Sequence, residues 1–212
     1  KLKGYKENDT LGGYENYSAS KASCEILFRS YFASYFKKNN YVKIASARAG
    51  NVIGGGDWSK DRLIPDIIRG IKKNKVIKIR NLKATRPWQH VLEPLFGYIN
   101  LALNLDKKEV NGQSFNIGPY KSKNYSVEKV LKLFQAKFKS IKWKKNPITK
   151  FEEQNLLNLN CKKIYLLTKW RNKYNFNQTV DKTIDWYIKY SKNNIRKLTE
   201  NQILEYIQLN EK

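Results

Sequence analysis

The stretch that decides the fold lies at residues 48–66 and reads Arg48-Ala-Gly-Asn-Val-Ile-Gly-Gly-Gly-Asp-Trp-Ser-Lys-Asp-Arg-Leu-Ile-Pro-Asp66. It follows a short apolar run, Val42 to Ala47, which predicts a buried strand. The glycine triplet predicts a flexible loop, and Pro65 opens a following helix, where proline is tolerated. Open α/β sheets bind ligands at loops that join a strand to a helix in this way. We therefore expect a binding site here.

Strands and helices alternate along the rest of the chain. The apolar spacing predicts helices at residues 19–38, 63–72, 91–105, 126–138 and 179–190, and strands at 42–47, 76–79 and 113–117. We expect the first helix to be buried, because its apolar residues recur at helical spacing. The tail beyond Lys192 predicts a polar helix with a frayed end. Such alternation favours an α/β fold.

Composition excludes several classes of protein. The 212 residues are 41% apolar, which is enough for a hydrophobic core. The polar N-terminus and the absence of a long apolar run predict neither a signal peptide nor a membrane span, so we expect a cytoplasmic protein. Cys24, Cys161 and His90 are the only cysteines and histidine and cannot assemble a zinc site, so we expect no metal. No nucleophile elbow accompanies His90, which argues against a serine hydrolase.

The net charge of +24 raises the alternative of a nucleic-acid-binding protein. However, 34 of the 42 basic residues are lysine, whereas base recognition favours the bidentate arginine side chain. The lysine excess is more typical of a solvated surface with weak, salt-sensitive affinity for polyanions. Nucleic-acid binding therefore stays a remote alternative, and we expect no specific nucleic-acid partner.

Tyr17 and Lys21 stand one helical turn apart, so both side chains project from the same helix face. A neighbouring ammonium favours the phenolate, which could then take a proton from a sugar hydroxyl. The spacing alone is weak evidence, since the pairs Tyr125/Lys129 and Tyr165/Lys169 share it. Only the first pair follows a glycine-rich turn and precedes the strand that leads into residues 48–66.

Four segments together carry a specific resemblance. They are Leu11-Gly-Gly-Tyr-Glu-Asn-Tyr-Ser-Ala-Ser-Lys21, Arg48-Ala-Gly-Asn-Val-Ile-Gly-Gly-Gly-Asp-Trp58, Asp61-Arg-Leu-Ile-Pro-Asp66 and Arg86-Pro-Trp-Gln-His-Val-Leu-Glu-Pro-Leu95. Over roughly residues 1–190 the chain resembles the extended short-chain dehydrogenase/reductase superfamily, and is most similar to its CDP-glucose 4,6-dehydratase branch. The resemblance implies part of an NAD(P)-binding Rossmann-like fold with a smaller substrate-binding lobe.

The resemblance also implies a cofactor, a substrate and roles for residues. NAD would be the cofactor, a nucleotide sugar the substrate, and the complete protein a homodimer. Tyr17 would be the catalytic base and Lys21 would hold the nicotinamide ribose. The backbone of Arg48, Ala49 and Gly50 would lie against the nicotinamide. The predicted substrate contacts are Asn51, Arg62, Leu63, Arg86 and His90.

Simpler roles remain open for several of these residues. Asn51 could satisfy a turn, and Arg62 and Arg86 could be surface charges. His90 is more typical of a structural contact or one at the nucleotide edge than of a catalyst. Trp58 and Trp88 could pack in the core or line the pocket. An epimerase or decarboxylase of the same superfamily would keep Tyr17 and Lys21, so those reactions also remain alternatives.

The chain departs from the family pattern at its start. It contains no Gly-x-x-Gly-x-x-Gly turn after a strand and no Thr-Asp-Lys element, which supplies the dehydration acid in the family. We therefore expect a C-terminal portion that lacks the N-terminal half of the Rossmann sheet and binds little NAD alone. The expected division is residues 1–119 for the Rossmann-like part, 120–190 for the substrate lobe and 191–212 for a tail.

Overall fold

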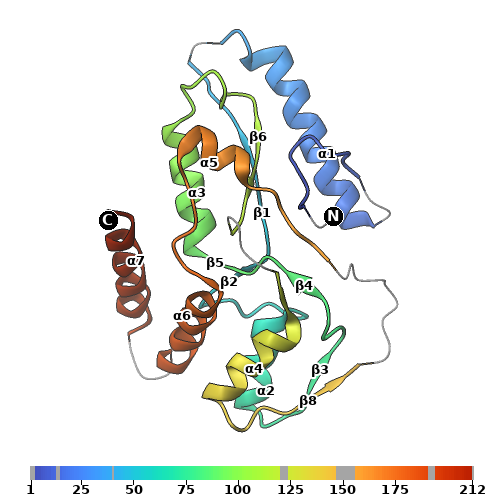
Figure 1. Cartoon of the computed structure of the whole chain (residues 1–212), viewed down its shortest axis with the longest axis vertical. Coiled ribbons are helices and arrows are strands. Elements are labelled where there is room, and N and C mark those ends of the chain that lie inside the picture. Colours follow the sequence, from blue (N-terminus) through green and yellow to red (C-terminus); the bar gives the residue numbers. More distant parts are fainter. Residues whose placement is uncertain are drawn as a thin grey trace.

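The computed structural model describes residues 3–12, 15–39, 41–119, 124–146, 156–190 and 194–211. The molecule is elongated (Figure 1). The helices are α1 Asn16–Tyr31, α2 Leu63–Lys72, α3 Leu92–Leu103, α4 Val127–Lys137, α5 Lys162–Thr168, α6 Phe176–Lys189 and α7 Ile195–Glu211, and a π-helical turn, Phe32–Phe36, follows α1. The strands are β1 Ser46–Ala49, β2 Val52–Ile53, β3 Ile77–Ile79, β4 Thr85–Arg86, β5 Gln89–His90, β6 Ser114–Ile117, β7 Tyr125–Ser126 and β8 Trp143–Lys145.

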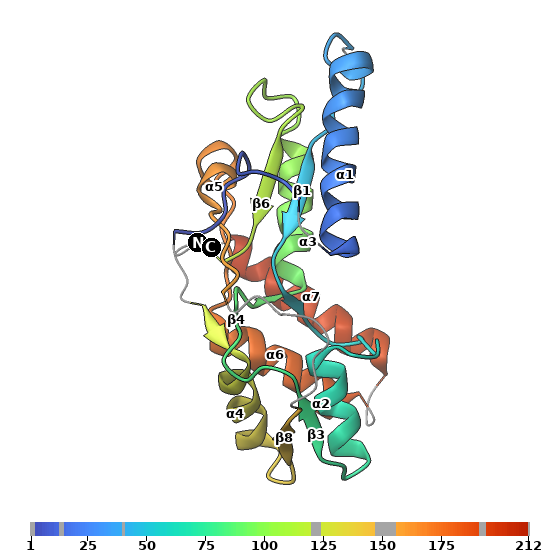
Figure 2. The ribbon, with the colours of Figure 1, turned by 90° about the vertical axis from the view of Figure 1, so that its right-hand side faces the viewer.

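The strands form short paired ladders, most of them parallel. β1 pairs with β6, β2 with β5 and β3 with β8 in parallel, whereas β4 and β7 pair in the antiparallel sense. Helix α1 lies on one side of the β1–β6 pair, and α3 and α5 lie on the other (Figures 1 and 2). Helices on both faces of parallel strands make this an α/β fold, as predicted.

The helices around the 48–66 stretch begin and end close to the predicted positions. α2 has the predicted bounds, and α3 carries Pro94 in its first turn. At α4 the Ser126 hydroxyl accepts a hydrogen bond from the Lys129 amide, so the predicted cap is confirmed. These segments have strong local signals, and their apolar faces are buried as the spacing requires.

Two predictions near the N-terminus were wrong. β1 begins at Ser46 rather than Val42, because the Tyr41 and Val42 amides donate to the Asn39 side chain and the Ile44 amide donates to Asn111. These amides therefore bind side chains instead of the backbone of a neighbouring strand. Helix α1 forms as predicted but buries none of its residues. Ile26, Leu27 and Tyr31 are more than half exposed, because their face meets no partner among the described residues.

The C-terminal tail forms a helix, α7, as predicted, and one of its aromatic residues is anchored in the interior. Tyr206 of α7 is fully buried, and its hydroxyl donates to the Glu93 carboxylate over 2.5 Å. The backbone amides of Lys173 and Tyr174 donate to the same carboxylate. Tyr206 thus attaches the polar tail to the rest of the molecule. Its ring packs against Phe96, and its hydroxyl donates to the buried Glu93 carboxylate.

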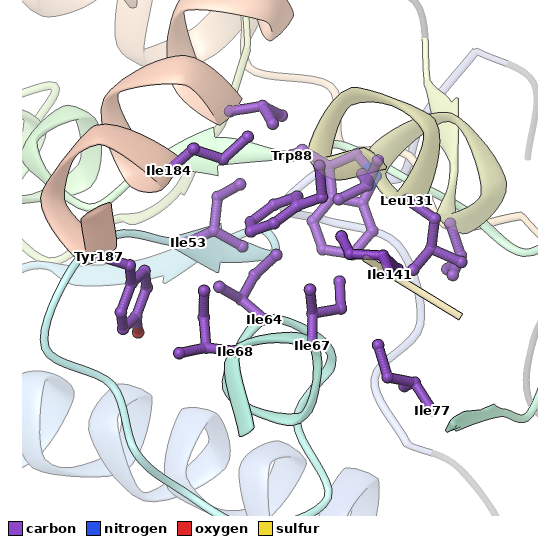
Figure 3. Packing of buried hydrophobic residues seen from close by; sticks show 14 of the residues in the cluster. Ile53, Ile64, Ile67, Ile68, Ile77, Trp88, Leu131, Ile141, Ile184 and Tyr187 are labelled. Carbon is purple, nitrogen blue, oxygen red and sulfur yellow. The ribbon is translucent and has the colours of Figure 1, made fainter. Parts of the chain in front are cut away.

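The largest hydrophobic core lies between α2, α4 and α6 (Figure 3). Ile67, Leu131, Phe134 and Ile184 are at most 1% exposed there. A second cluster surrounds β6, where Phe115 and Ile117 are fully buried. No helix in the part of the chain that the structure describes has the length and apolar character of a membrane span.

Candidate functional site

A pocket of about 660 Å³ opens beside the 48–66 stretch. Its walls come from the loop after β2, the start of α2, the end of β3 and the segment around β4. Asn51, Arg62, Leu63 and Arg86, all predicted from the sequence to contact the substrate, line it. The structure therefore brings four of the five predicted substrate contacts to one cavity.

The pocket lining combines apolar side chains with more basic than acidic ones. Arg86 is 7% exposed, and the Arg80 guanidinium donates to the Asp61 carbonyl over 3.0 Å. Asp66 lines the pocket, and its carboxylate forms an ion pair with Arg69, which does not line it. The charged lining residues are Lys60, Arg62, Lys78, Arg80 and Arg86 against Asp57, Asp61 and Asp66. An excess of positive charge together with apolar side chains suits a ligand with both phosphate oxygens and a ring.

Trp88 and Trp58, whose roles were open, take different positions. Trp88 is 8% exposed, lines the pocket and donates its indole N–H to the Tyr125 carbonyl over 2.9 Å. Trp58 does not line the pocket and packs against Tyr187 and Tyr190 of α6 instead. Packing therefore accounts for Trp58, whereas Trp88 belongs to both the core and the pocket.

Tyr17 and Lys21 lie together on α1, away from the pocket lining. The Lys21 Nζ is 5.7 Å from the centroid of the Tyr17 ring, so the ammonium and the phenol are neighbours as the spacing predicts. Tyr17 is 72% exposed. Neither residue lines the pocket, and their catalytic role stays a prediction.

An ion pair fixes α1 to the strands, and the sequence analysis missed one of its members. The Arg48 Nε and Nη2 each donate to Glu25 over 2.9 Å, and the Ser114 hydroxyl donates to the same carboxylate over 2.8 Å. These contacts lower the pKa of Glu25 to about 2, chiefly through Arg48. Glu25 stands four residues after Lys21, on the same helix face, and that spacing could have identified it.

The end of β1 has small side chains at the predicted cofactor positions, Ala49 and Gly50. The Gly50 amide donates to the Ile117 carbonyl over 3.1 Å, so the chain here follows β6. A Cβ atom at Gly50 would lie 3.1 Å from the Pro87 ring, which leaves little room for any side chain. Small residues at the carboxyl end of a parallel strand let a flat ring approach the backbone.

His90 is buried behind the pocket rather than in its lining. It is 1% exposed, and burial lowers the pKa of its imidazole to about 4, so it is neutral at pH 7. Its Nδ1 accepts a long hydrogen bond from the Leu92 amide, and its ring meets the Tyr174 ring edge-on. The predicted substrate contact of His90 has no support from this position and stays a prediction.

Within the described ranges, no group of three His, Cys, Asp or Glu side chains is placed to hold a metal ion.

Comparison with known proteins matches both the motifs and the fold. Residues 3–118 match the model of the NAD dependent epimerase/dehydratase family. A CDP-glucose 4,6-dehydratase of Salmonella typhimurium is 38% identical over an alignment of 193 residues, and the alignment covers 87% of this chain and 53% of that protein. The chain therefore spans about half the length of this curated relative.

Solved structures share the fold at lower identity. A dTDP-glucose 4,6-dehydratase from Bacillus anthracis in complex with NAD has a TM-score of 0.72 at 21% identity, covering 89% of this chain and 57% of that one. A UDP-glucuronic acid 4-epimerase from Bacillus cereus in complex with UDP-glucuronic acid and NAD has a TM-score of 0.69 at 17% identity, covering 87% and 59%. Both dehydratases and epimerases share this Rossmann-like fold, so the fold alone does not separate the two reactions.

Proposed function

The chain belongs to the NAD dependent epimerase/dehydratase family, and from this premise we propose that it forms part of a dehydratase that converts CDP-glucose to CDP-4-dehydro-6-deoxyglucose. The pocket is the observation that carries the proposal. Most of its lining residues, Arg62 and Arg86 among them, come from the two segments most distinctive of the dehydratase resemblance, residues 48–66 and 86–95. The 38% identity to a CDP-glucose 4,6-dehydratase favours dehydration over the other reactions of the family.

Arg62 and Arg86 are the proposed contacts for the pyrophosphate. A guanidinium donates two parallel hydrogen bonds in one plane and so fixes phosphate oxygens in orientation as well as in position. Arg86 is almost fully buried, which limits competition from water. Asn51 and Leu63 complete this side of the pocket. Together these contacts would position the hexose for proton transfer.

Tyr17 is the proposed base at the hexose C4 hydroxyl. The Lys21 ammonium lies beside the phenol ring, and the phenol oxygen would accept the hydroxyl proton as the C4–H bond breaks. Bound NAD would supply the acceptor for the hydride from C4 and the donor that returns it to C6 after the loss of water across C5 and C6. The small residues Ala49 and Gly50 would lie against the nicotinamide, because a position without a Cβ atom lets a flat ring approach the backbone. Glu25 and Arg48 would keep α1 in place against β1.

Product analysis with the whole protein that contains these 212 residues tests the proposal. With NAD and CDP-glucose we expect a 4-keto-6-deoxy sugar, detected by its absorbance in alkali. Tyr17→Phe should lower kcat about 10²- to 10⁴-fold, because it removes the proton acceptor. Tyr125→Phe is the matched control, since it has the same spacing to a lysine but its ring stacks on Phe176 away from α1.

The alternatives make different products. An epimerase would release a sugar epimer with no loss of water, and that result would overturn the dehydratase assignment. A nucleic-acid-binding protein would retain duplex DNA at near-physiological salt, where lysine-rich surfaces release it. We expect no such retention, because most of the positive charge is lysine.

A further inference from the structure

One wall of the pocket is a loop that contains no helix or strand. This wall loop, residues 54–59, joins β2 to the turn before α2, and Gly54, Gly55 and Asp57 line the cavity. It begins with three glycines, and Gly56 adopts a positive φ of 84°. Glycine has the largest conformational freedom of any residue. The position of this wall therefore depends on contacts from outside the loop.

Helix α2 supplies the first of these contacts. The Arg69 Nη1 donates to the Trp58 carbonyl over 2.8 Å, and its Nη2 donates to the Ser59 carbonyl over 2.9 Å. Arg69 also pairs with Asp66, which keeps the guanidinium oriented toward the loop. One side chain thus binds two successive backbone carbonyls at the end of the wall.

Helix α6 supplies the second set. The Tyr187 hydroxyl donates to the Asp57 carbonyl over 2.7 Å, and the Tyr187 side chain is buried between α6 and α2 (Figure 3). Trp186 packs so closely on Gly55 that a Cβ atom there would lie 2.0 Å from its ring. Burial raises the pKa of Tyr187 to about 12, so its hydroxyl stays a neutral donor at pH 7.

Trp58 holds the wall loop through contacts outside the pocket lining. Its ring meets the Tyr187 ring edge-on at 5.3 Å, and the Lys72 ammonium lies 4.7 Å from the centroids of both Trp58 and Tyr190. Trp186 in turn donates its indole N–H to the Thr199 hydroxyl of α7 over 3.0 Å. A continuous set of contacts therefore runs from α7 through α6 to the pocket wall.

We propose that Tyr187 and Arg69 are positioning residues that hold the wall loop against α6 and α2 and thereby set the affinity of the pocket for its nucleotide-sugar ligand. Neither residue lines the pocket. The statement about affinity rests on the proposed function, whereas the statement about the loop does not. Tyr187 lies beyond residue 118, where the family match ends, so a residue proposed to position this pocket wall comes from the C-terminal helices.

Hydrogen exchange of the 212-residue chain tests the hold on the loop. Tyr187→Phe keeps the ring and removes the bond to the Asp57 carbonyl, so exchange in a peptide covering residues 54–59 should rise about threefold to tenfold. Peptides from β6 should exchange at the wild-type rate. Tyr174→Phe is the matched control, since its buried hydroxyl has no hydrogen-bond partner among the described residues and its loss should leave the loop unchanged. An unchanged loop in Tyr187→Phe, or an equal rise in every peptide, would overturn the proposal.

Calorimetric titration with CDP-glucose tests the consequence for binding. We expect the Kd of Tyr187→Phe to be about threefold to tenfold higher than that of the wild type. In the whole protein the same substitution should raise KM by that factor and leave kcat within about twofold, whereas general unfolding would lower kcat. Equal affinities would contradict the positioning role. If the wild type binds no CDP-glucose and the loop still responds to Tyr187→Phe, the proposed substrate fails and the hold on the loop is upheld.

Discussion

The two regions that hold the proposed site differ in what surrounds them. The pocket lies next to the largest core, and its wall and base are supported by α2, α4 and α6. The Tyr17–Lys21 pair lies on α1, a helix with no buried residue. One region is stabilised by packing and the other by a few polar bonds to β1. The proposed ligand binding and the proposed proton transfer would therefore depend on different kinds of contact, and the two regions can be disturbed separately.

Cavity formation in the core should have the largest effect on stability. Leu131 is fully buried among α2, α4 and α6, so Leu131→Ala should lower the free energy of unfolding by about 2–5 kcal/mol. Leu27→Ala on α1 is the matched control. Because Leu27 is 57% exposed, its loss should cost about 0.5 kcal/mol or less. Urea unfolding of both variants measures the difference, and equal losses would mean that α1 is packed after all.

A methyl group at Gly55 should have the next largest effect. Gly55→Ala places a Cβ atom against the Trp186 ring and should cost about 1–3 kcal/mol of stability. In a Trp186→Ala background the cost of Gly55→Ala should shrink, because the ring it meets has gone. A cost that is independent of Trp186 would contradict the close packing of the wall loop on α6.

The ion pair between Glu25 of α1 and Arg48 should make the free energy of unfolding depend on pH. The pKa of Glu25 falls from an ordinary 4.5 to about 2 in the folded chain. Its contribution is therefore fully present above pH 4.5 and is lost as the pH falls toward 2. Glu25→Gln should cost about 1–2 kcal/mol at pH 7, and the difference from the wild type should narrow over that range. A difference that is constant with pH would contradict the Glu25–Arg48 pair as its source.

The sequence predicted best those parts in which a local signal and the tertiary packing agree. The bounds of α2 and the Ser126 cap of α4 were predicted because apolar spacing, proline and a capping hydroxyl all indicate the same helix. The motifs also identified four pocket residues, Asn51, Arg62, Leu63 and Arg86, since they stand in segments with unusual glycine and arginine patterns.

The rest depended on contacts between distant residues, which have no local signal. The burial of Tyr206 requires Glu93, which is 113 residues away in the sequence. The late start of β1 depends on the Asn39 and Asn111 side chains, and the hold of Tyr187 on the Asp57 carbonyl spans 130 residues. Likewise, the exposure of α1 could not be read from its apolar spacing, because the spacing does not tell which face meets a partner.

The fate of the hydrogen at C4 tests the central claim most directly. The whole protein that contains these residues is supplied with NAD and CDP-glucose carrying deuterium at C4, and the product is analysed by NMR. The account predicts that the deuterium moves to the C6 methyl group of a 4-keto sugar, because the hydride taken from C4 returns to C6 after water has left. Deuterium returned to C4 of an epimer that keeps its C6 hydroxyl would contradict it.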